Sequence, residues 1–396
     1  MPVTASSSEY LDRACAVDEP IALARASVFM LSLPQIRVFR SAYGRSSGRK
    51  RLIVIRLEDA DGFTGWGEAP IAERPLYGAD TAESTWWALT GLLLPPLLGA
   101  TFAGPARLAA TWAGLIGQNY AKNAIETAAW AIASARLGVP LGRLWGGTRD
   151  AVPVGESFPI CDTLDALHAE VSARVAEGFG RIKLKIAPGW DVEPARAMRE
   201  AFPSLPVSVD ANCGYAPGDP VFAELDELGL LMIEQPLAGD ALLEMAELQQ
   251  ALSTPLCLDE SASSVNTTRT ALALSAGRIV NIKPPRLGGI GPALAVHDLC
   301  AEQGVPAWCG GMLETGIGRG FNLALAALPG FTLHSDMSPA RMFYAHDLVD
   351  PTFDIRPDGL IDVPSRPGNG FPVAPERIAD ATIRSWESDG RTPAAP

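Results

Sequence analysis

Six ionisable residues at the ends of short apolar segments could together carry proton-transfer chemistry. They follow the segments RIKLKI, VSVDAN, LLMIEQP, LCLDES and IVNIKPP in turn, and they are Lys183, Lys185, Asp210, Glu234, Asp259 and Lys283. From Lys185 onward, the steps between them are 25, 24, 25 and 24 residues. Grouped carboxylates can hold a cation, and an amine whose pKa is lowered can act as a base near neutral pH. The pattern therefore indicates base catalysis beside a bound cation.

Asp210, Glu234 and Asp259 are the candidate metal ligands. If they end consecutive strands of one barrel, the three carboxylates share a small volume and repel one another by several kcal/mol at an effective dielectric of about 20. They can all stay ionised only if a cation joins them, and carboxylate oxygens favour a hard divalent ion, Mg²⁺ by default. A solvated loop position or a helix N-cap explains any one of these acids equally well, but not three at matching strand ends.

The lysines are the candidate bases. Lys183 and Lys185 are two residues apart, so they share one face of a strand, and we expect each ammonium to lower the pKa of the other. Taken alone, the KLK sequence fits an ordinary exposed strand end better. Lys283 ends the sixth expected strand, across the barrel from the second, so two amines would flank a metal-bound substrate on opposite faces of one carbon. A lone lysine that caps a loop is the alternative for Lys283.

The elements that must position these residues follow from the interval itself. A step of 24 or 25 residues is the length of one strand, one helix and two short loops, and such a period predicts an array of βα units. We expect an α/β fold with a (β/α) barrel, a modified TIM barrel, over residues 146–343, with the polar residues where the strands end. The expected strands are 153–157, 182–186, 207–211, 230–234, 255–259, 279–283, 305–309 and 330–334.

An α+β capping domain is expected before the barrel, over residues 21–145. The segment RLIVIRLEDADGFTGWGEAP predicts a hairpin that turns at Asp61-Gly62, and helical patterns follow at about 81–98 and 106–137. Residues 1–20 are small, polar and acidic, which predicts a disordered tail. Residues 344–396 are rich in Pro, Gly and Asp, and we expect this C-terminal segment to return to the capping domain.

The composition of the chain limits the kinds of molecule that the protein is expected to bind. The formal net charge is −13 without a basic run, so neither nucleic acid nor an anionic membrane is expected as a partner. The six cysteines lack metal-type spacing and mostly lie in apolar segments, which predicts buried thiols in a reducing compartment. The acidic N-terminus does not resemble a secretory signal, and Pro95 and Pro96 interrupt the longest apolar stretch. We therefore expect a cytoplasmic protein with a small-molecule substrate, and a homo-oligomer, because large barrels often self-associate.

Gly310 and Gly311 follow the seventh expected strand in the segment CGGMLETGIGRG. The segment is rich in glycine but lacks the strand–turn–helix spacing of a phosphate-binding loop. Two explanations remain open for the pair: close approach of the backbone to a ligand, or tight packing inside the barrel.

Together these motifs resemble the enolase superfamily, in its muconate-lactonising subgroup, and most of all the o-succinylbenzoate synthase/N-acylamino acid racemase family. The resemblance covers about residues 25–380, with GWGE at 65–68 and RPLYGADT at 74–81 similar to capping-domain signatures. The other segments that carry it are RIKLKIAPGWDVEPARAMRE, VDAN, MIEQPL, CLDES, NIKP and WCGGMLETGIGR. Pro285, where the family usually has Gly, and TLHSDMSP at 332–339 depart from the pattern, which leaves the identity of the substrate open.

The resemblance implies a role for each candidate residue. The three acids would bind Mg²⁺, for which Mn²⁺ or another divalent ion can substitute. Lys185 and Lys283 would be acid/base residues on opposite faces of the substrate, and Lys183 would tune and position Lys185. Arg286 matches an arginine typical of members with racemase activity, and Phe39–Gly44 resembles the mobile capping loop. The implied substrate-binding residues are Ser157, Asn212, Glu260, Arg286, Gly310, Gly311, Met312 and Tyr43.

The implied reaction is metal-dependent removal of the proton α to a carboxylate, through a Mg²⁺-stabilised enediolate. Return of a proton by the other lysine would racemise an N-acyl amino acid, N-succinyl by expectation, and expulsion of a β-hydroxyl would give o-succinylbenzoate. The first is an isomerase reaction and the second a carbon–oxygen lyase reaction. Arg286 and the complete lysine pair favour the racemase, with synthase activity in the same site. The alternatives are a dedicated o-succinylbenzoate synthase of the menaquinone pathway, a cycloisomerase, and a non-catalytic barrel protein. The last is disfavoured because the two bases and three ligands are all present.

Overall fold

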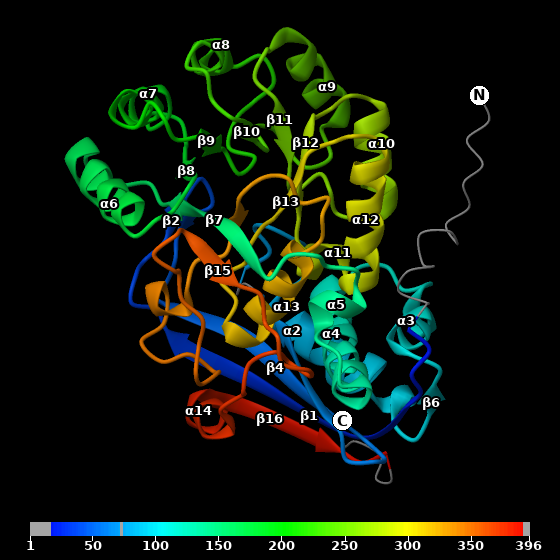
Figure 1. Cartoon of the computed structure of the whole chain (residues 1–396). Helices are drawn as coiled ribbons and strands as arrows, with labels where there is room; N and C mark the ends of the chain where they lie inside the picture. The colour runs from blue at the N-terminus through cyan, green and yellow to red at the C-terminus, as the bar shows by residue number, and fades with distance from the viewer. Residues whose placement is uncertain (1–16, 72–73, 391–396) are drawn as a thin grey trace.

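Two sheets organise the chain in the computed structural model, which describes residues 17–71 and 74–390. A five-stranded antiparallel sheet lies beneath a barrel of parallel strands and surrounding helices (Figure 1). Most of the predicted tail over residues 1–20 falls outside the described residues. Its last residues pack on the capping domain, because Glu19 Oε1 accepts a hydrogen bond from Arg136 Nε at 2.8 Å.

The antiparallel sheet joins the two ends of the described chain. Side chains alternate between buried and partly exposed along much of its longest strand, as expected for a strand with one covered face. The last described strand pairs with this first long one, with Val28 opposite Trp386, and the two lie side by side in Figure 1. The strands of this sheet are β1 (Ile21–Pro34), β4 (Arg49–Asp59), β5 (Thr64–Ala69), β6 (Thr101–Phe102) and β16 (Thr382–Ser388), and a separate small hairpin is formed by β2 (Arg40–Ser41) and β3 (Gly44–Arg45).

The hairpin between β4 and β5 forms at the predicted turn. Asp59 Oδ1 accepts hydrogen bonds from the backbone N–H groups of Asp61 at 3.0 Å and Phe63 at 2.8 Å. Gly62 has a φ of +87°, a left-handed conformation that glycine adopts without strain. The turn therefore depends on both the carboxylate and the glycine.

The two helices predicted in the capping domain are both interrupted. The first is α2 (Ala82–Trp87), a π-helical turn η2 (Ala88–Leu93) and a 3₁₀ turn η3 (Pro95–Leu97). The second is α3 (Pro105–Ala109), a 3₁₀ turn η4 (Ala110–Trp112) and α4 (Asn119–Leu137). Helix α4 cannot begin earlier, because Gly117 and Gln118 have left-handed φ values of 69° and 55°. The continuous helix expected over 106–137 was therefore wrong before residue 119.

Helix α4 packs directly on β5, which explains the GWGE motif. A Cβ added at Gly65 would lie 2.0 Å from the carbonyl oxygen of Ala128, and one at Gly67 would lie 1.9 Å from that of Ala124. Any larger residue would push the helix off the strand. Because the barrel covers its other side, α4 is buried almost all round and carries mostly alanine and large apolar residues.

The parallel sheet is a nearly closed eight-stranded barrel, as predicted. Its hydrogen-bonded order is β13-β12-β11-β10-β9-β8-β7-β14. An isolated bridge between Ala307 and Phe331, with a hydrogen bond from Cys309 N to Ser335 Oγ at 3.1 Å, joins the two ends of this order. The strands are β7 (Ala151–Phe158), β8 (Ile182–Lys185), β9 (Val207–Asp210), β10 (Ile233–Glu234), β11 (Leu256–Leu258), β12 (Ile279–Ile282), β13 (Ala307–Cys309) and β14 (Ser335–Asp336).

Helices connect these strands around the outside of the barrel (Figure 1). They are α6 (Leu164–Ala176), α7 (Val192–Ala201), α8 (Val221–Asp226), α9 (Leu242–Ala251), α10 (Val265–Ala273), α11 (Pro284–Leu287), α12 (Ile290–Glu302) and α13 (Gly316–Ala326), and the short helix α5 (Leu141–Leu144) precedes the first strand, β7. After the barrel come the 3₁₀ turn η5 (Ala340–Met342), the strand β15 (Leu360–Asp362), which pairs antiparallel with β7, and α14 (Pro375–Ala381). Among the described helices, none has both the length and the apolar character needed to span a membrane.

The eighth barrel strand was predicted at the wrong place. It was expected at 330–334 but lies at Ser335–Asp336. The backbone N–H groups of Thr332 and Leu333 both point to the carbonyl of Ala307, so this stretch makes a local contact with β13 and no regular ladder. The shift moves Asp336 to the end of a strand.

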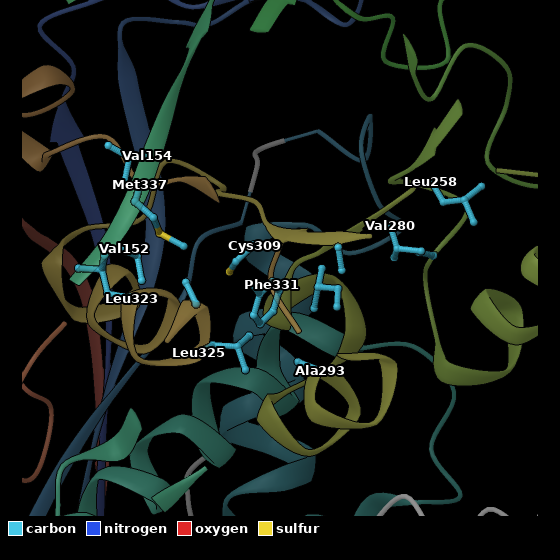
Figure 2. Close-up of a cluster of buried hydrophobic side chains, with 14 of the residues drawn as sticks. Val152, Val154, Leu258, Val280, Ala293, Cys309, Leu323, Leu325, Phe331 and Met337 are labelled. Atoms are coloured by element: carbon cyan, nitrogen blue, oxygen red, sulfur yellow. The ribbon is translucent and has the colours of Figure 1, made fainter. Parts of the chain in front are cut away.

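Apolar side chains from the strands and the outer helices hold the strand ends in place. Figure 2 shows Val154 of β7, Leu258 of β11 and Val280 of β12 with Leu325 of α13 in one buried cluster. Each of these side chains is fully buried. Close packing of this kind restricts the strands and, with them, the polar residues at their ends.

Candidate active site

The predicted functional residues gather at the carboxyl ends of the barrel strands. A cavity of about 200 Å³ lies there between the barrel and the capping domain. Barrel residues on its wall include Ser157, Lys183, Lys185, Asn212, Lys283, Gly311, Met312 and Asp336, and capping-domain residues include Phe39, Ser41, Tyr43, Lys50 and Tyr77. A larger hollow of about 1140 Å³ lies at the amino ends of β11, β12 and β13, where Pro255, Arg278 and Pro306 line it. We assign the chemistry to the smaller cavity, because barrel enzymes carry it at the carboxyl ends of their strands.

Strand register brings the three acids into one volume. Lys185 lies opposite Asp210 in the β8–β9 pair, and Asp210 lies opposite Glu234 in the β9–β10 pair. Asp259 follows the end of β11, the next strand. All three carboxylates are at most 1% exposed. Their burial near one another explains why they influence one another's ionisation.

The pKa shifts differ among the three acids. Burial alone would raise the pKa of Asp210, but Lys185 and Lys183 outweigh it and hold the pKa below its ordinary value. Lys283 and Arg286 do the same for Asp259, so its pKa also lies below the ordinary value. Burial and the charge of Asp210 raise the pKa of Glu234 to about 8. Glu234 is therefore the acid that depends most on a further cation.

The donor set fits a hard divalent cation in chemical type and in burial. Glu234 Oε2 makes no hydrogen bond, although Lys183 Nζ lies 3.2 Å from it. Over residues 17–71 and 74–390, no group of three or more acidic, histidine or cysteine side chains is arranged closely enough to enclose an ion. The carboxylates pair instead with the amines of Lys183, Lys185 and Lys283. Each of the three carboxylates that would hold an ion is therefore paired with at least one amine.

Lys183 is enclosed by carboxylates. Its Nζ lies 2.6 Å from Asp336 Oδ2, 3.2 Å from Glu234 Oε2 and 3.4 Å from Asp210 Oδ2. The ring of Trp308, with its centroid 4.7 Å away, covers another side. Burial alone would lower the pKa of Lys183, but the three carboxylates outweigh it and raise the pKa above its ordinary value. The pKa of Lys183 is thus raised overall, although a neighbouring ammonium was expected to lower it, because three anions face the amine.

Lys185 lies nearer to the cavity and makes two hydrogen bonds. Its Nζ donates to Asp210 Oδ2 at 2.6 Å and to Asn212 Oδ1 at 2.8 Å. The side chain is 13% exposed, whereas that of Lys183 is 3% exposed. Of the two lysines of β8, Lys185 is therefore the one placed to reach a substrate atom.

Lys283 approaches the acids from the other side, with three strands between its strand and that of Lys185. Its Nζ donates to Asp259 Oδ2 at 2.7 Å and lies 3.2 Å from the hydroxyl oxygen of Tyr77. Arg286 pairs with Asp259 and donates from Nε to the carbonyl oxygen of Ala262 at 2.8 Å. Arg286 therefore contacts Asp259 without lining the cavity.

Seven of the eight residues predicted to bind substrate divide into two groups, and Gly310 stands apart from both. Ser157, Asn212, Gly311, Met312 and Tyr43 line the cavity. Glu260 and Arg286 instead contact lining residues, Glu260 through Tyr43 and Asn212 and Arg286 through Tyr77. A Cβ at Gly310 would lie 2.6 Å from Lys283 Cε and 2.2 Å from Asn281 Oδ1. Gly310 thus leaves room for a lysine side chain, which supports the packing explanation at this position.

Three further residues belong to the site but were not predicted from the sequence. Asp336 binds Lys183, and its position at a strand end was hidden by the misplaced eighth strand. The hydroxyl of Tyr77 donates to Asp259 Oδ1 at 2.6 Å; it lies in the RPLYGADT segment, which was noted only as a signature. Lys50 lies in a stretch with six cations and no acid between residues 37 and 51, which could have marked the stretch as an anion-attracting segment.

Comparison with known proteins agrees with this arrangement. Residues 26–146 match the mandelate racemase/muconate lactonizing enzyme N-terminal domain, and residues 166–377 match the enolase C-terminal domain-like family. An o-succinylbenzoate synthase of Geobacillus kaustophilus is 44% identical over 325 residues, 82% of this chain and 86% of that protein. An N-succinylamino acid racemase of Amycolatopsis sp is 42% identical over 357 residues, 89% of this chain and 95% of that protein.

A solved structure shows the same fold over nearly the whole chain. It is an enolase-superfamily member from Listeria innocua, with a TM-score of 0.89 and 32% sequence identity, and the match covers 93% of this chain and 99% of that one. With both domain models matched and relatives above 40% identity, the chain belongs to the enolase superfamily and, within it, to the mandelate racemase/muconate lactonizing enzyme group.

Proposed function

We propose that this enzyme racemises N-succinyl amino acids by proton transfer between Lys185 and Lys283, and that the same site can form o-succinylbenzoate. The observation that carries the proposal is the placement of two amines on either side of three buried carboxylates. Lys185 Nζ is 2.6 Å from Asp210 Oδ2, and Lys283 Nζ is 2.7 Å from Asp259 Oδ2. Removal of a proton by one amine and its return by the other inverts the carbon between them.

The relatives support both halves of the proposal. The similar proteins include some named o-succinylbenzoate synthase and others named N-succinylamino acid racemase, at comparable identity to this chain. Both reactions begin with the loss of a proton next to a carboxylate, so one set of side chains can serve both. In the synthase reaction, Lys185 would act as base and then as acid, while Lys283 would remain a cation beneath the developing negative charge.

We assign Asp210, Glu234 and Asp259 to a divalent ion, with Mg²⁺ as the preferred ion. When bound, the ion would supply a Lewis acid for the substrate carboxylate. The unbonded Glu234 Oε2 and the all-oxygen donor set support this assignment. Lys183 keeps a positive charge beside the same acids, and the lysines on the cavity wall attract an anionic substrate.

Arg286 supports the racemase half. Its guanidinium is buried, pairs with Asp259 and lies 3.2 Å from the hydroxyl of Tyr77, which in turn contacts Lys283. Burial lowers the pKa of Lys283, and the charge of Arg286 does the same, but Asp259 and Glu234 outweigh them and hold the pKa above its ordinary value. Arg286 thus partly offsets the effect of the carboxylate that it shares with Lys283.

Lys50 supports a substrate that carries a second carboxylate. It lines the same cavity as the three site lysines and also an adjoining hollow of about 320 Å³, whose wall includes Arg45, Arg49 and Arg74. Burial lowers the pKa of Lys50 to about 8, against the opposing charges of Glu314 and Glu68. An anionic acyl group such as succinyl would favour the charged form of this amine. We therefore propose N-succinyl over N-acetyl substrates.

The proposal is tested by incubation of N-succinyl-L-phenylalanine with the full-length enzyme and Mg²⁺, with chiral chromatography as readout. We expect the D enantiomer to accumulate to an equal mixture, EDTA to stop the reaction, and N-acetyl-L-phenylalanine to react more slowly. The precursor of o-succinylbenzoate is assayed in parallel by absorbance. Turnover of that precursor without any racemisation would replace the proposal with a dedicated synthase, and turnover of neither would refute both.

A further inference from the structure

We propose that Tyr43, in the capping loop, is a positioning residue for the base Lys185 and acts through Glu260 and Asn212. The capping loop is defined here as residues 39–44, and its two ends form the small hairpin of β2 and β3. The inference rests on the proposed function, because it assumes that Lys185 and Lys283 remove protons from opposite faces. Tyr43 would then affect proton transfer only on the face that Lys185 serves.

A continuous chain of hydrogen bonds joins the capping loop to Lys185. The hydroxyl of Tyr43 donates to Glu260 Oε1 at 2.6 Å. The amide of Asn212 donates from Nδ2 to the same Glu260 oxygen at 3.2 Å, and its Oδ1 accepts from Lys185 Nζ at 2.8 Å. This series of hydrogen bonds therefore runs from the capping domain to the end of β11, then to the end of β9 and finally to β8.

Each link has a defined direction. An ammonium can only donate, so Asn212 must present Oδ1 to Lys185, which leaves Nδ2 for the carboxylate of Glu260. Glu260 Oε1 accepts from both Asn212 and Tyr43. Loss of the Tyr43 hydroxyl would remove one of the two donors that hold this oxygen and so loosen the amide that orients the base.

The backbone at Asn212 leaves little freedom for other arrangements. Asn212 is 5% exposed and has a left-handed φ of 44°, and its backbone N–H donates to Asp210 Oδ1 at 3.1 Å. Its side chain therefore leaves the strand end in one direction, between Lys185 and Glu260. The Asn212 amide is buried, so a water molecule is a poor substitute for the hydrogen bond that the Tyr43 hydroxyl donates to Glu260.

The capping loop is seated on the barrel, which brings Tyr43 to Glu260. The carbonyl oxygen of Arg40 accepts a hydrogen bond from the backbone N–H of Ile160 at 2.9 Å, just after β7. Just before the loop, Arg37 pairs with Glu170 at 2.5 Å. The tyrosine hydroxyl can reach Glu260 only while the loop covers the site. The alignment of Lys185 thus includes one hydrogen bond that comes from the capping loop.

Lys283 depends on a different tyrosine. The hydroxyl of Tyr77 lies 3.2 Å from Lys283 Nζ and donates to Asp259 Oδ1 at 2.6 Å. The rings of Tyr43 and Tyr77 meet edge to face, with centroids 6.4 Å apart, and the two hydroxyls donate to different acids, Glu260 and Asp259. Removal of the Tyr43 hydroxyl should therefore disturb proton transfer on one face and leave the other face intact.

The test compares Tyr43→Phe with the wild-type enzyme in D₂O with Mg²⁺. Exchange of the α-proton is followed by NMR separately for N-succinyl-L-phenylalanine and N-succinyl-D-phenylalanine. Tyr215→Phe is the matched control, because it also removes one tyrosine hydroxyl, bonded to Asp191 Oδ2 at 3.1 Å outside the site. Lys185→Ala identifies which enantiomer loses its proton to Lys185.

We expect Tyr43→Phe to slow exchange about three- to tenfold for the Lys185-dependent enantiomer alone, the size of one hydrogen bond's net contribution. Racemisation must slow equally in both directions, because the two enantiomers have equal energy. Tyr215→Phe should leave exchange of both enantiomers at the wild-type rate. Equal slowing of both enantiomers in Tyr43→Phe would show a general role in loop closure and overturn the proposal, as would an unchanged rate.

A second measurement keeps this inference separate from the proposed function. If the wild-type enzyme exchanges neither enantiomer, the racemase proposal fails, but labelling of lysine amines by acetic anhydride still reports on the chain of hydrogen bonds. Mass spectrometry would then give the labelling of Lys185 relative to Lys283. We expect this ratio to rise at least twofold in Tyr43→Phe and to stay constant in Tyr215→Phe. A constant ratio in Tyr43→Phe would overturn the inference without reference to any substrate.

Discussion

At the scale of single residues, Lys183 and Lys185 have different surroundings although they lie two positions apart on one strand. Lys183 faces three carboxylates and the ring of Trp308, which favour its ammonium form. Of these three carboxylates, Lys185 contacts only Asp210, and its second hydrogen bond goes to the neutral amide of Asn212. A fixed positive charge at Lys183 can offset the crowded acids while Lys185 exchanges protons. The residues that create the difference are Glu234 and Asp336, and Asp336 is the nearer, at 2.6 Å from Lys183 Nζ.

Replacement of Asp336 by Asn tests this role in stability. Asp336 pairs with Lys183 and with Arg181, whose side chain is fully buried. Loss of one partner of a buried pair leaves an uncompensated charge, so we expect Asp336→Asn to lower the free energy of unfolding by about 3 kcal/mol. The measurement is urea denaturation at neutral pH. Asp362→Asn, which removes an exposed partner of Arg356, should change it by at most about 0.5 kcal/mol. Equal effects of the two variants would contradict the account of Asp336.

At the scale of elements, helix α4 links the capping domain to the segment that carries Lys283. Asn119, at its start, donates from Nδ2 to the carbonyl oxygen of Arg286 at 2.7 Å. Glu126, two turns further on, accepts from the backbone N–H of Gly291 at 2.8 Å and from Trp130 Nε1 at 3.2 Å. One capping-domain helix therefore holds both ends of the short stretch between Lys283 and α12.

Glu126 should make the stability of this link depend on pH. Burial raises the pKa of Glu126 from 4.5 to about 7, although its hydrogen bonds oppose the shift. Between these two values the folded protein holds a proton that the unfolded chain has released, so stability falls as pH rises through this window.

Glu126→Gln is neutral at every pH and should lack this dependence. We expect the stability of the wild type relative to Glu126→Gln to fall by up to about 3 kcal/mol between pH 4.5 and 7. Urea denaturation of both proteins at several pH values measures the difference. Parallel pH profiles would show that Glu126 is ionised in the folded protein throughout this range and would contradict the account of its burial.

Prediction from sequence succeeded for elements that depend on local pattern. The interval between Lys185 and Lys283 reflects the length of a βα unit, and Asp61-Gly62 has a turn geometry that follows from its residue types. The eighth strand and the start of α4 could not be predicted, because one is set by contacts with Ala307 and the other by a left-handed Gln118. Apolar periodicity does not report either feature.

At the scale of the whole molecule, the site exists only where two domains meet. The barrel supplies the acids and lysines, whereas Tyr43, Tyr77 and Lys50 come from the capping domain. Their contacts join positions up to 217 residues apart, as between Tyr43 and Glu260, and no local pattern in the sequence indicates such pairs. The roles of the metal ligands and bases, the homo-oligomeric state and the cytoplasmic location stay predictions.

Lys185 and Lys283 are proposed to move protons on opposite faces of one carbon. The most direct test is α-proton exchange in D₂O with Mg²⁺, followed by NMR for each enantiomer of N-succinyl-phenylalanine with Lys185→Ala and Lys283→Ala. We expect that neither variant racemises the substrate, that each loses exchange of a different enantiomer, and that each loss is at least about a hundredfold. Exchange of both enantiomers at the wild-type rate in either variant would contradict this proposal.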